Sequence, residues 1–158
     1  MSASWLLPLF LVVASVAAME GLAIFVHKYV MHGWGWGWHR SHHTPRTGWF
    51  EKNDLYALVF AALSVAFFTL VAARWPVLWW VGAGIALYGL LYVLVHDGLV
   101  HRRIPFVKAP KSGYLKRLVQ AHRLHHAVRD REGAVSFGFL YAPPVAKLRA
   151  TLREGRTP

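Results

Sequence analysis

The hydrophobic positions of the chain gather in three long segments, at about residues 5–26, 55–73 and 77–95. A helix of about 20 apolar residues crosses a bilayer core of ~30 Å, so each segment is predicted to be a membrane span. The first has no basic leader and no small-residue cleavage signature, which favours a retained span over a signal peptide. Only Arg74, Trp75 and Pro76 separate the second and third segments, which are therefore predicted to form a tight antiparallel hairpin.

A fourth apolar stretch, at residues 134–145, is too short to cross a bilayer as a helix and contains Pro143 and Pro144. We expect it to be a re-entrant or interfacial segment, with a short fourth span as the alternative. The pattern predicts an all-α, integral membrane helical bundle of three full spans. Residues 27–54 and 96–145 would form a helical cap, within a single domain that covers residues 1–158.

Composition and charge support the membrane interpretation. The 158 residues are 56% hydrophobic, and 18 Lys and Arg against 7 Asp and Glu give a net charge of +11. A soluble nucleic-acid-binding domain would not carry such apolar runs, so no nucleic acid partner is predicted. Arg74 is the one basic residue between the second and third segments. The positive-inside rule therefore places the N-terminus outside and the cap in the cytoplasm of a multi-pass protein.

The ten histidines form two copies of one pattern. Each copy has a pair separated by four residues and then a His-x-x-His-His triplet, and together they are His27, His32, His39, His42, His43 and His96, His101, His122, His125, His126. Each copy follows a predicted span on the side assigned to the cytoplasm. There is no cysteine, which excludes disulfides and thiolate metal ligands.

The spacing of the histidines indicates metal binding. Residues at i, i+3 and i+4 share one helical face, so each triplet is predicted to converge on one point. Residues at i and i+5 diverge by about 140° on an ideal α-helix, and they converge better at a helix end or at a π-bulge. A zinc site needs three or four protein ligands, so ten histidines fit two adjacent ions better than one. Imidazole suits Zn, Cu, Fe and Ni, so the spacing does not choose the metal.

Four acidic residues are candidates for supporting roles. Glu20 interrupts the first span two helical turns before His27, and an ionisable group there indicates either a role beside the site or a structural hydrogen bond. Asp97 and Asp130 lie close to histidines and are candidate acceptors for the second ring N–H of a metal-bound imidazole. Asp54, just before the second span, is predicted to be a helix N-cap.

The aromatic and basic residues near the histidines have less specific interpretations. Trp34, Trp36 and Trp38 alternate with glycines. They are predicted to anchor the span at the lipid headgroups, and the alternative is that they line the metal site. Six basic residues are predicted to be solvent-facing or lipid-facing charge: Arg102, Arg103, Lys108, Lys111, Lys116 and Arg117.

Four longer motifs carry a family resemblance. They are HKYVMHGWGWGWHRSHH at residues 27–43, NDLYA at 53–57, YGLLYVLVHDGLVHRR at 88–103 and GYLKRLVQAHRLHHAVRDREGAVSFGFLYAPP at 113–144. The order of the histidine boxes resembles the membrane fatty-acid hydroxylase and sterol desaturase superfamily of non-haem di-iron enzymes. From about residue 19 to residue 153, the flanking sequence resembles the bacterial beta-carotene 3-hydroxylases of that superfamily, with no departure at any of the ten histidines.

The resemblance implies an enzyme of a bacterial cytoplasmic membrane that hydroxylates carotenoid rings at C3 and C3′, from beta-carotene through beta-cryptoxanthin to zeaxanthin. It also implies that all ten histidines bind or support two iron ions, that O2 is the co-substrate, and that electrons arrive from reduced ferredoxin and its NAD(P)H reductase. The chain has no cysteine for an iron–sulfur cluster of its own. The alternatives are a carotenoid ketolase, an acyl-lipid hydroxylase or desaturase, and a non-enzymatic metal-binding membrane protein.

Overall fold

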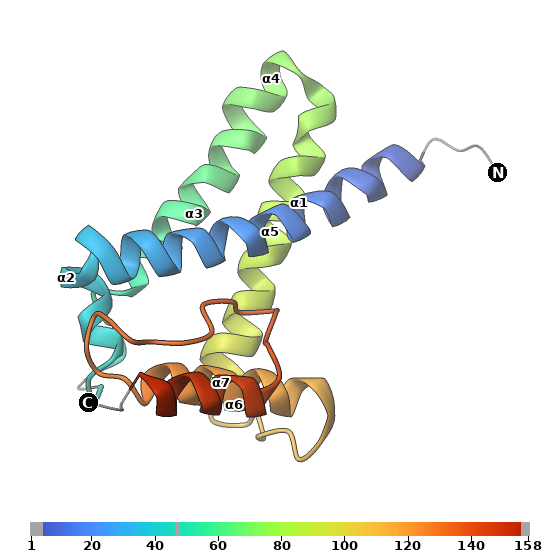
Figure 1. Cartoon of the computed structure of the whole chain (residues 1–158). Coiled ribbons are helices and arrows are strands. Elements are labelled where there is room, and N and C mark those ends of the chain that lie inside the picture. Colours follow the sequence, from blue (N-terminus) through green and yellow to red (C-terminus); the bar gives the residue numbers. More distant parts are fainter. Residues whose placement is uncertain (1–4, 47, 156–158) are drawn as a thin grey trace.

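The computed structural model describes residues 5–46 and 48–155, and within them every regular element is a helix (Figure 1). Three helices are long and apolar enough to cross a membrane: Leu6–Trp34, Asp54–Arg74 and Pro76–Val100. The three predicted spans are therefore confirmed, as is the hairpin between the second and third. The chain is an all-helical membrane protein.

Each span is built from consecutive helical elements. The first is α1 (Leu6–Phe25) followed by the π-helix η2 (Val26–Trp34). The second is α3 (Asp54–Ala66), η4 (Phe67–Val71) and α4 (Ala72–Arg74). The third is η5 (Pro76–Leu78), α5 (Trp79–Tyr92) and the π-helix η6 (Val93–Val100). Between the first two spans lie α2 (Trp36–His39) and η3 (Arg40–His42).

The spans pack through small residues, because hydrocarbon outside the bundle gives apolar side chains little reason to prefer the interior. At Gly84 on α5, a Cβ atom would lie 2.8 Å from the carbonyl oxygen of Val12 on α1. Within the hairpin, the Ser64 hydroxyl donates to the carbonyl oxygen of Gly82 at 3.0 Å. These close approaches hold α1 and α3 against α5.

The first and third spans extend further than the hydrophobic pattern predicts, and they do so as π-helix. The segments predicted to end at 26 and 95 continue to Trp34 and Val100, the first with a kink at Gly33, whose φ and ψ are not helical. The His101 N–H donates to the His96 carbonyl at 2.9 Å, an i to i+5 bond of the kind that defines a π-helix. The π-helical irregularity suggested by the His-x4-His spacing is thus confirmed for both pairs. His27, His32 and His96 lie in the last turns of the spans, and His101 follows the third span directly.

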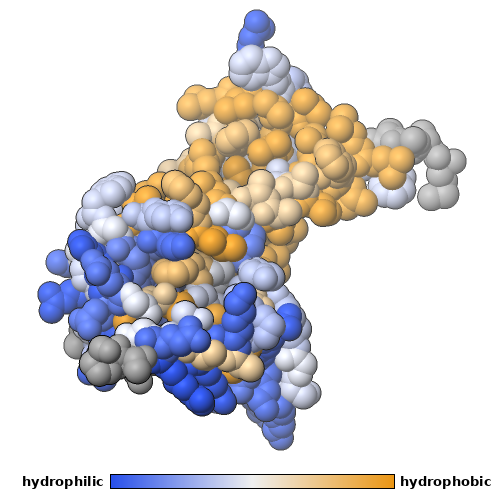
Figure 2. Space-filling model, in the orientation of Figure 1, coloured by the Kyte–Doolittle hydropathy of each residue, from blue (hydrophilic) through white to orange (hydrophobic). Residues whose placement is uncertain are grey.

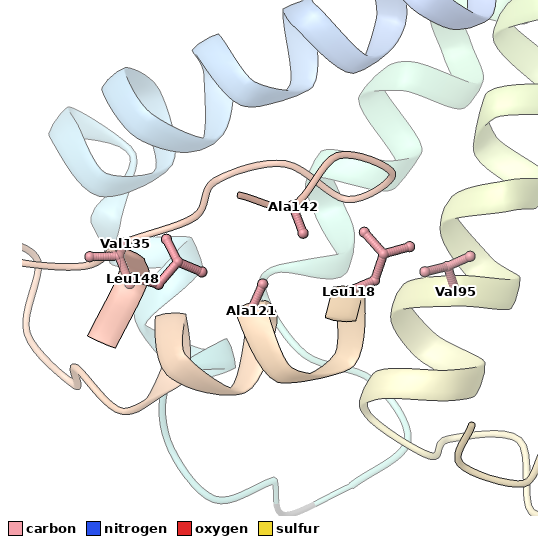
Figure 3. Close-up of a cluster of buried hydrophobic side chains, with 6 residues drawn as sticks. All are labelled: Val95, Leu118, Ala121, Val135, Ala142 and Leu148. Carbon is pink, nitrogen blue, oxygen red and sulfur yellow. The ribbon is translucent and has the colours of Figure 1, made fainter. Parts of the chain in front are cut away.

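The remaining helices, α6 (Gly113–His126) and α7 (Val145–Glu154), form a cap across one end of the spans (Figure 1). A small apolar core joins the cap to the third span (Figure 3), and its members are Val95, Leu118, Ala121, Val135, Ala142 and Leu148. The surface of the spans is largely hydrophobic and that of the cap largely hydrophilic (Figure 2). Residues 134–144 form an irregular segment, so this stretch is not a fourth helical span.

Candidate metal centre

The ten histidines lie together at the junction of spans and cap, and they form two groups of five. The first histidine group comprises His27, His32, His39, His43 and His125. Its Nε2 atoms converge: His27 and His39 lie 3.1 Å apart, His39 and His43 3.2 Å, His43 and His125 3.1 Å, and His125 and His32 3.2 Å. The ligand atoms of four of these residues all lie within 4.8 Å of one another.

The second histidine group comprises His42, His96, His101, His122 and His126. The Nε2 atoms of His42 and His96 lie 3.0 Å apart, those of His101 and His122 3.2 Å, and those of His122 and His126 2.9 Å. The two groups are adjacent, since the rings of His43 and His126 stack with centroids 4.5 Å apart. Each group presents converging imidazole nitrogens, a donor set that suits a transition metal ion.

The prediction that each triplet converges on one point is wrong. His39 and His43 belong to the first group, whereas His42 between them belongs to the second. In the other triplet, His122 and His126 belong to the second group and His125 belongs to the first. On a helix of 3.6 residues per turn, positions i+3 and i+4 fall on opposite sides of position i, about 100° apart. The i+3 histidine therefore reaches across to the neighbouring group.

The first histidine group is oriented by uncharged acceptors on its Nδ1 side. Four of its Nδ1 atoms hydrogen bond to carbonyl oxygens: His27 to Phe137 at 2.9 Å, His32 to Arg131 at 2.7 Å, His43 to Val128 at 2.9 Å and His125 to Val135 at 3.0 Å. The fifth, His39, donates to Asn53 Oδ1 at 2.7 Å. Because a carbonyl oxygen can only accept, these bonds assign the proton to Nδ1 and leave Nε2 with the lone pair that binds metal.

Two imidazoles of the second histidine group are oriented by carboxylates instead. His42 Nδ1 lies 3.0 Å from Glu51 Oε2, and His96 Nδ1 lies 2.8 Å from Asp97 Oδ1. The structure thus brings Asp97 to the position expected of it. Asp130 does not bond to a histidine in this way, because its side chain is exposed. The acceptor for His32 Nδ1 is instead the carbonyl oxygen of the neighbouring Arg131.

Sequence reasoning missed the guanidinium that joins the acidic residues of this region. Arg103 lies 3.0 Å from Glu51, 2.8 Å from Asp54 and 3.6 Å from Asp97, and its side chain is 13% exposed. The prediction that Arg103 is solvent-facing charge is therefore wrong. Asp54 is the first residue of α3, with Asn53 at the N-cap position, and it bonds both to Arg103 and to the Glu51 N–H.

Glu20 supports the site indirectly, through the irregular segment. Its Oε1 atom accepts three main-chain N–H bonds, from Phe139 at 3.0 Å, Leu140 at 3.1 Å and Tyr141 at 2.8 Å. Its Oε2 atom accepts the Tyr88 hydroxyl at 2.8 Å. The segment held in this way carries the Phe137 and Val135 carbonyls, which orient two histidines of the first group. Glu20 therefore acts through hydrogen bonds to this segment and does not bond to a histidine itself.

Trp34 and Trp36 take different roles, one at the membrane surface and the other beside the metal site. Trp34 is 86% exposed, as expected of a residue that anchors a span among headgroups. Trp36 lies against the first histidine group, with ring centroids 5.2 Å from His32 and 5.3 Å from His43. Gly35 between them has no side chain to obstruct the Tyr56 hydroxyl, which donates to the Gly35 carbonyl at 2.9 Å.

Burial keeps the histidines outside the spans in their neutral form. Desolvation lowers the pKa of His39 to about 3, of His43 to about 4 and of His101 to about 4. Burial and the neighbouring imidazoles also lower the pKa of His122 and His125 well below the usual value of 6.5. At neutral pH these side chains therefore offer lone pairs to a metal without first losing a proton.

An apolar cavity of about 550 Å³ approaches the histidines from the spans. Met19 and Ala23 on the first span, Phe60 on the second and Tyr92 on the third contribute to its walls. Phe139 lies at its inner end, stacked on His27 with centroids 5.2 Å apart and edge-on to His96 at 5.3 Å. A substrate in this cavity would therefore reach Phe139, whose ring contacts one histidine of each group.

A separate pocket of about 320 Å³ reaches the second histidine group from the cap. It is lined by His42, His101 and His126 together with Arg123 and Arg129. The centre therefore has an apolar approach through the spans and a basic approach through the cap.

Comparison with known proteins agrees with this architecture. The model of the fatty acid hydroxylase family matches residues 12–143. The chain belongs to the fatty acid hydroxylase family. It is thus a member of the family that its histidine boxes resemble. No solved structure matches this chain.

Curated relatives within the family carry more specific names. A beta-carotene hydroxylase of Pantoea ananas is 62% identical over 151 residues, covering 95% of this chain and 86% of the relative. One from Paracoccus sp. (strain PC1) is 56% identical over 145 residues, covering 91% and 90%. The chloroplastic beta-carotene 3-hydroxylase of Haematococcus lacustris is 43% identical over 141 residues, covering 85% of this chain and 43% of the relative.

Replacement of Glu20 tests its role in holding the irregular segment. In Glu20→Leu, main-chain N–H groups of residues 139–141 lose their acceptor, and we expect the free energy of unfolding to fall by about 2–4 kcal/mol. Glu20→Gln retains a side-chain oxygen for these groups and should lose less than about half as much. Unfolding in detergent, followed by circular dichroism, measures both variants. Equal losses would show that the hydrogen bonds to the segment do not account for the effect.

Proposed function

We propose that this chain is a carotenoid ring hydroxylase, which adds hydroxyl groups at C3 and C3′ of beta-ionone rings and converts beta-carotene through beta-cryptoxanthin to zeaxanthin. The observation that carries the proposal is the ten-histidine centre at the inner end of an apolar cavity within the spans. The names of the relatives from Pantoea ananas and Paracoccus support the choice of substrate. A transport protein would instead place its ligands near the middle of the membrane.

The proposed cofactor is a pair of iron ions, with the first histidine group holding one and the second histidine group the other. The donor set fits, because each group directs Nε2 lone pairs to a common point and its Nδ1 contacts fix that orientation. Bound iron would supply the activation of O2 and the oxidation of an unactivated C–H bond, which redox-inert zinc does not. The protein's own contribution is to orient the imidazoles, exclude water and direct a ring of the substrate toward them.

The chemistry of the cavity favours a hydrocarbon substrate over an acyl lipid with a polar headgroup. Four hydroxyls line it, and three are already bonded within the protein: Tyr56 to the Gly35 carbonyl, Ser64 to the Gly82 carbonyl and Tyr88 to Glu20. A site built to select a polar group would present polar side chains to it. A beta-ionone ring has no such group, and apolar contact with Phe139 and the span residues suffices to position it.

We propose that the N-terminus lies outside and the cap in the cytoplasm, on the basis of the basic residues. The resemblance to bacterial enzymes supports the bacterial cytoplasmic membrane as the location. Reduced ferredoxin, supplied by an NAD(P)H-dependent reductase, is the proposed electron donor. The basic pocket beside His101 and His126 supports this choice, since Arg123 and Arg129 would attract an acidic carrier.

Pigment analysis tests the proposed reaction. A bacterium that makes beta-carotene should accumulate zeaxanthin when it also makes this chain. His125→Ala removes a fully buried imidazole of the first histidine group, and we expect its conversion to fall at least about 100-fold. Lys147→Ala on α7, an exposed position outside the histidine groups, is the control and should retain full conversion. Unchanged beta-carotene despite good membrane expression of the natural chain would contradict the substrate assignment.

A change of cavity shape tests the route of the substrate. Gly89 lines the cavity, and a Cβ atom there would meet no atom within 4 Å, so a leucine at this position projects into open space. Gly89→Leu should lower conversion of beta-carotene about 10-fold, because it occupies the volume that the substrate needs. Its iron content, measured on purified protein, should not change. Gly21→Leu, at an equally open glycine on α1 outside the cavity lining, is the matched control.

The ionic strength of the assay tests the proposed electron donor. With purified, reduced ferredoxin and saturating beta-carotene, an increase from about 50 mM to 500 mM salt should slow turnover about 10-fold, because salt screens the attraction between the acidic carrier and the basic cap. Turnover that is independent of salt would contradict docking by charge.

A further inference from the structure

The two histidine groups are related by an exchange of equivalent positions. The first histidine group takes four members from the first copy of the pattern, namely the His-x4-His pair and the first and last histidines of the triplet. Its fifth member, His125, comes from the second copy. The second histidine group likewise takes the pair and the first and last triplet histidines of the second copy. Its fifth member, His42, comes from the first copy. His42 and His125 are the middle members of their triplets. If the affinity for a metal ion depended only on the type and number of ligands, the two groups would bind their ions equally tightly.

The contacts behind the imidazoles break this equivalence. All five Nδ1 acceptors of the first histidine group are uncharged, being four main-chain carbonyls and the Asn53 side chain. The two Nδ1 acceptors identified for the second group are the carboxylates of Glu51 and Asp97. The difference occurs at equivalent positions, since His42 bonds to a carboxylate whereas its counterpart His125 bonds to the Val135 carbonyl.

Arg103 fixes these carboxylates in place. It contacts Glu51, Asp97 and Asp54 together, so that three acidic side chains surround a single guanidinium. When the carboxyl groups are ionised, this network carries a net negative charge next to the second histidine group. The groups are largely buried, with side-chain exposures of 10% for Glu51 and 16% for Asp97, so water screens their charge less than it would at the surface.

A carboxylate changes what an imidazole can do as a ligand. It attracts the Nδ1 proton more strongly than a carbonyl does, which raises the electron density on the ring and the basicity of Nε2. The negative network also attracts the metal cation itself, at a distance of one imidazole ring. Both effects favour binding at the second group over the first, and both increase with the charge of the ion.

From this asymmetry we infer that the two metal positions are inequivalent, and that the network of Glu51, Asp97 and Arg103 makes the second histidine group the tighter one. The inference rests on the proposed two-iron function and adds a role for residues outside the histidine set. Glu51, Asp97 and Arg103 are positioning residues, because they act through His42 and His96. The first group, whose His27 stacks on the cavity residue Phe139, is the weaker position.

Iron binding by the purified full-length chain tests this inference without any assay of activity. Ferrous ⁵⁷Fe is added without oxygen, the number of ions bound per chain is counted, and a competing chelator then measures each affinity. Mössbauer spectra of the singly and doubly loaded protein show whether the two ions have distinct signals. We expect two ions per chain, two affinities and two signals, with the tighter ion giving the signal that appears first.

Two substitutions with opposite effects on charge identify which histidine group binds the tighter ion. Asp97→Asn removes a charge behind His96 and should weaken the tighter ion about 10- to 100-fold, with its signal shifted and the other unchanged. Asn53→Asp introduces a carboxylate behind His39 in the first group and should strengthen the weaker ion, with the other signal unchanged. This second variant gains affinity, so it decides the question even if Asp97→Asn does not fold.

The outcomes separate the inference from the proposed function. Two ions of equal affinity in the natural chain, or variants that change both ions equally, would overturn the inference and leave the two-iron function intact. A natural chain that binds one iron or none would instead contradict the proposed function.

Discussion

The fold of the cap depends on the need to gather ten imidazoles, eight of them buried, without charging them. An unpaired polar group in a dry interior is costly, so the Nδ1 side of each buried ring needs an acceptor. The five rings of the first histidine group obtain theirs from residues 128–137 and from Asn53, and this requirement draws an irregular segment of the cap against the first span. In these five rings, the hydrogen bond at Nδ1 leaves Nε2 as the atom that can bind a metal.

The same requirement explains why an acid occurs inside an apolar helix. An irregular segment has no helical or sheet partners for its own N–H groups, and near a membrane water does not supply them. Glu20 accepts three of these N–H bonds with one oxygen atom and the Tyr88 hydroxyl with the other. A single carboxylate on α1 therefore stabilises the segment that orients His27 and His125.

The sequence was sufficient to predict the parts of this structure that depend on local periodicity. Hydropathy predicted the three spans. The His-x4-His spacing indicated a helix end or a π-helical turn, because residues i and i+5 diverge on an ideal α-helix. The angle of about 100° between positions i+3 and i+4 allows each triplet to divide. Which group each member joins depends on how the segments pack against one another, and the spacing does not contain that information. Arg103 and Asn53 were missed for the same reason: their partners lie 49 and 14 residues away in the chain. Asp97 was predicted correctly because its partner is the adjacent residue.

The crossing of His42 and His125 has a consequence for assembly of the centre. Each histidine group takes four members from one half of the chain and one from the other, so neither half can form a complete group alone. A metal ion bound to all five imidazoles of a group must therefore join the two halves, and its binding free energy becomes part of the stability of the cap. A simple pair of independent sites, one per half, would add nothing to the contacts between the halves. The exchange of one ligand in each direction would couple two bound ions through the protein. Both groups contact the ring of Phe139 at the end of the cavity.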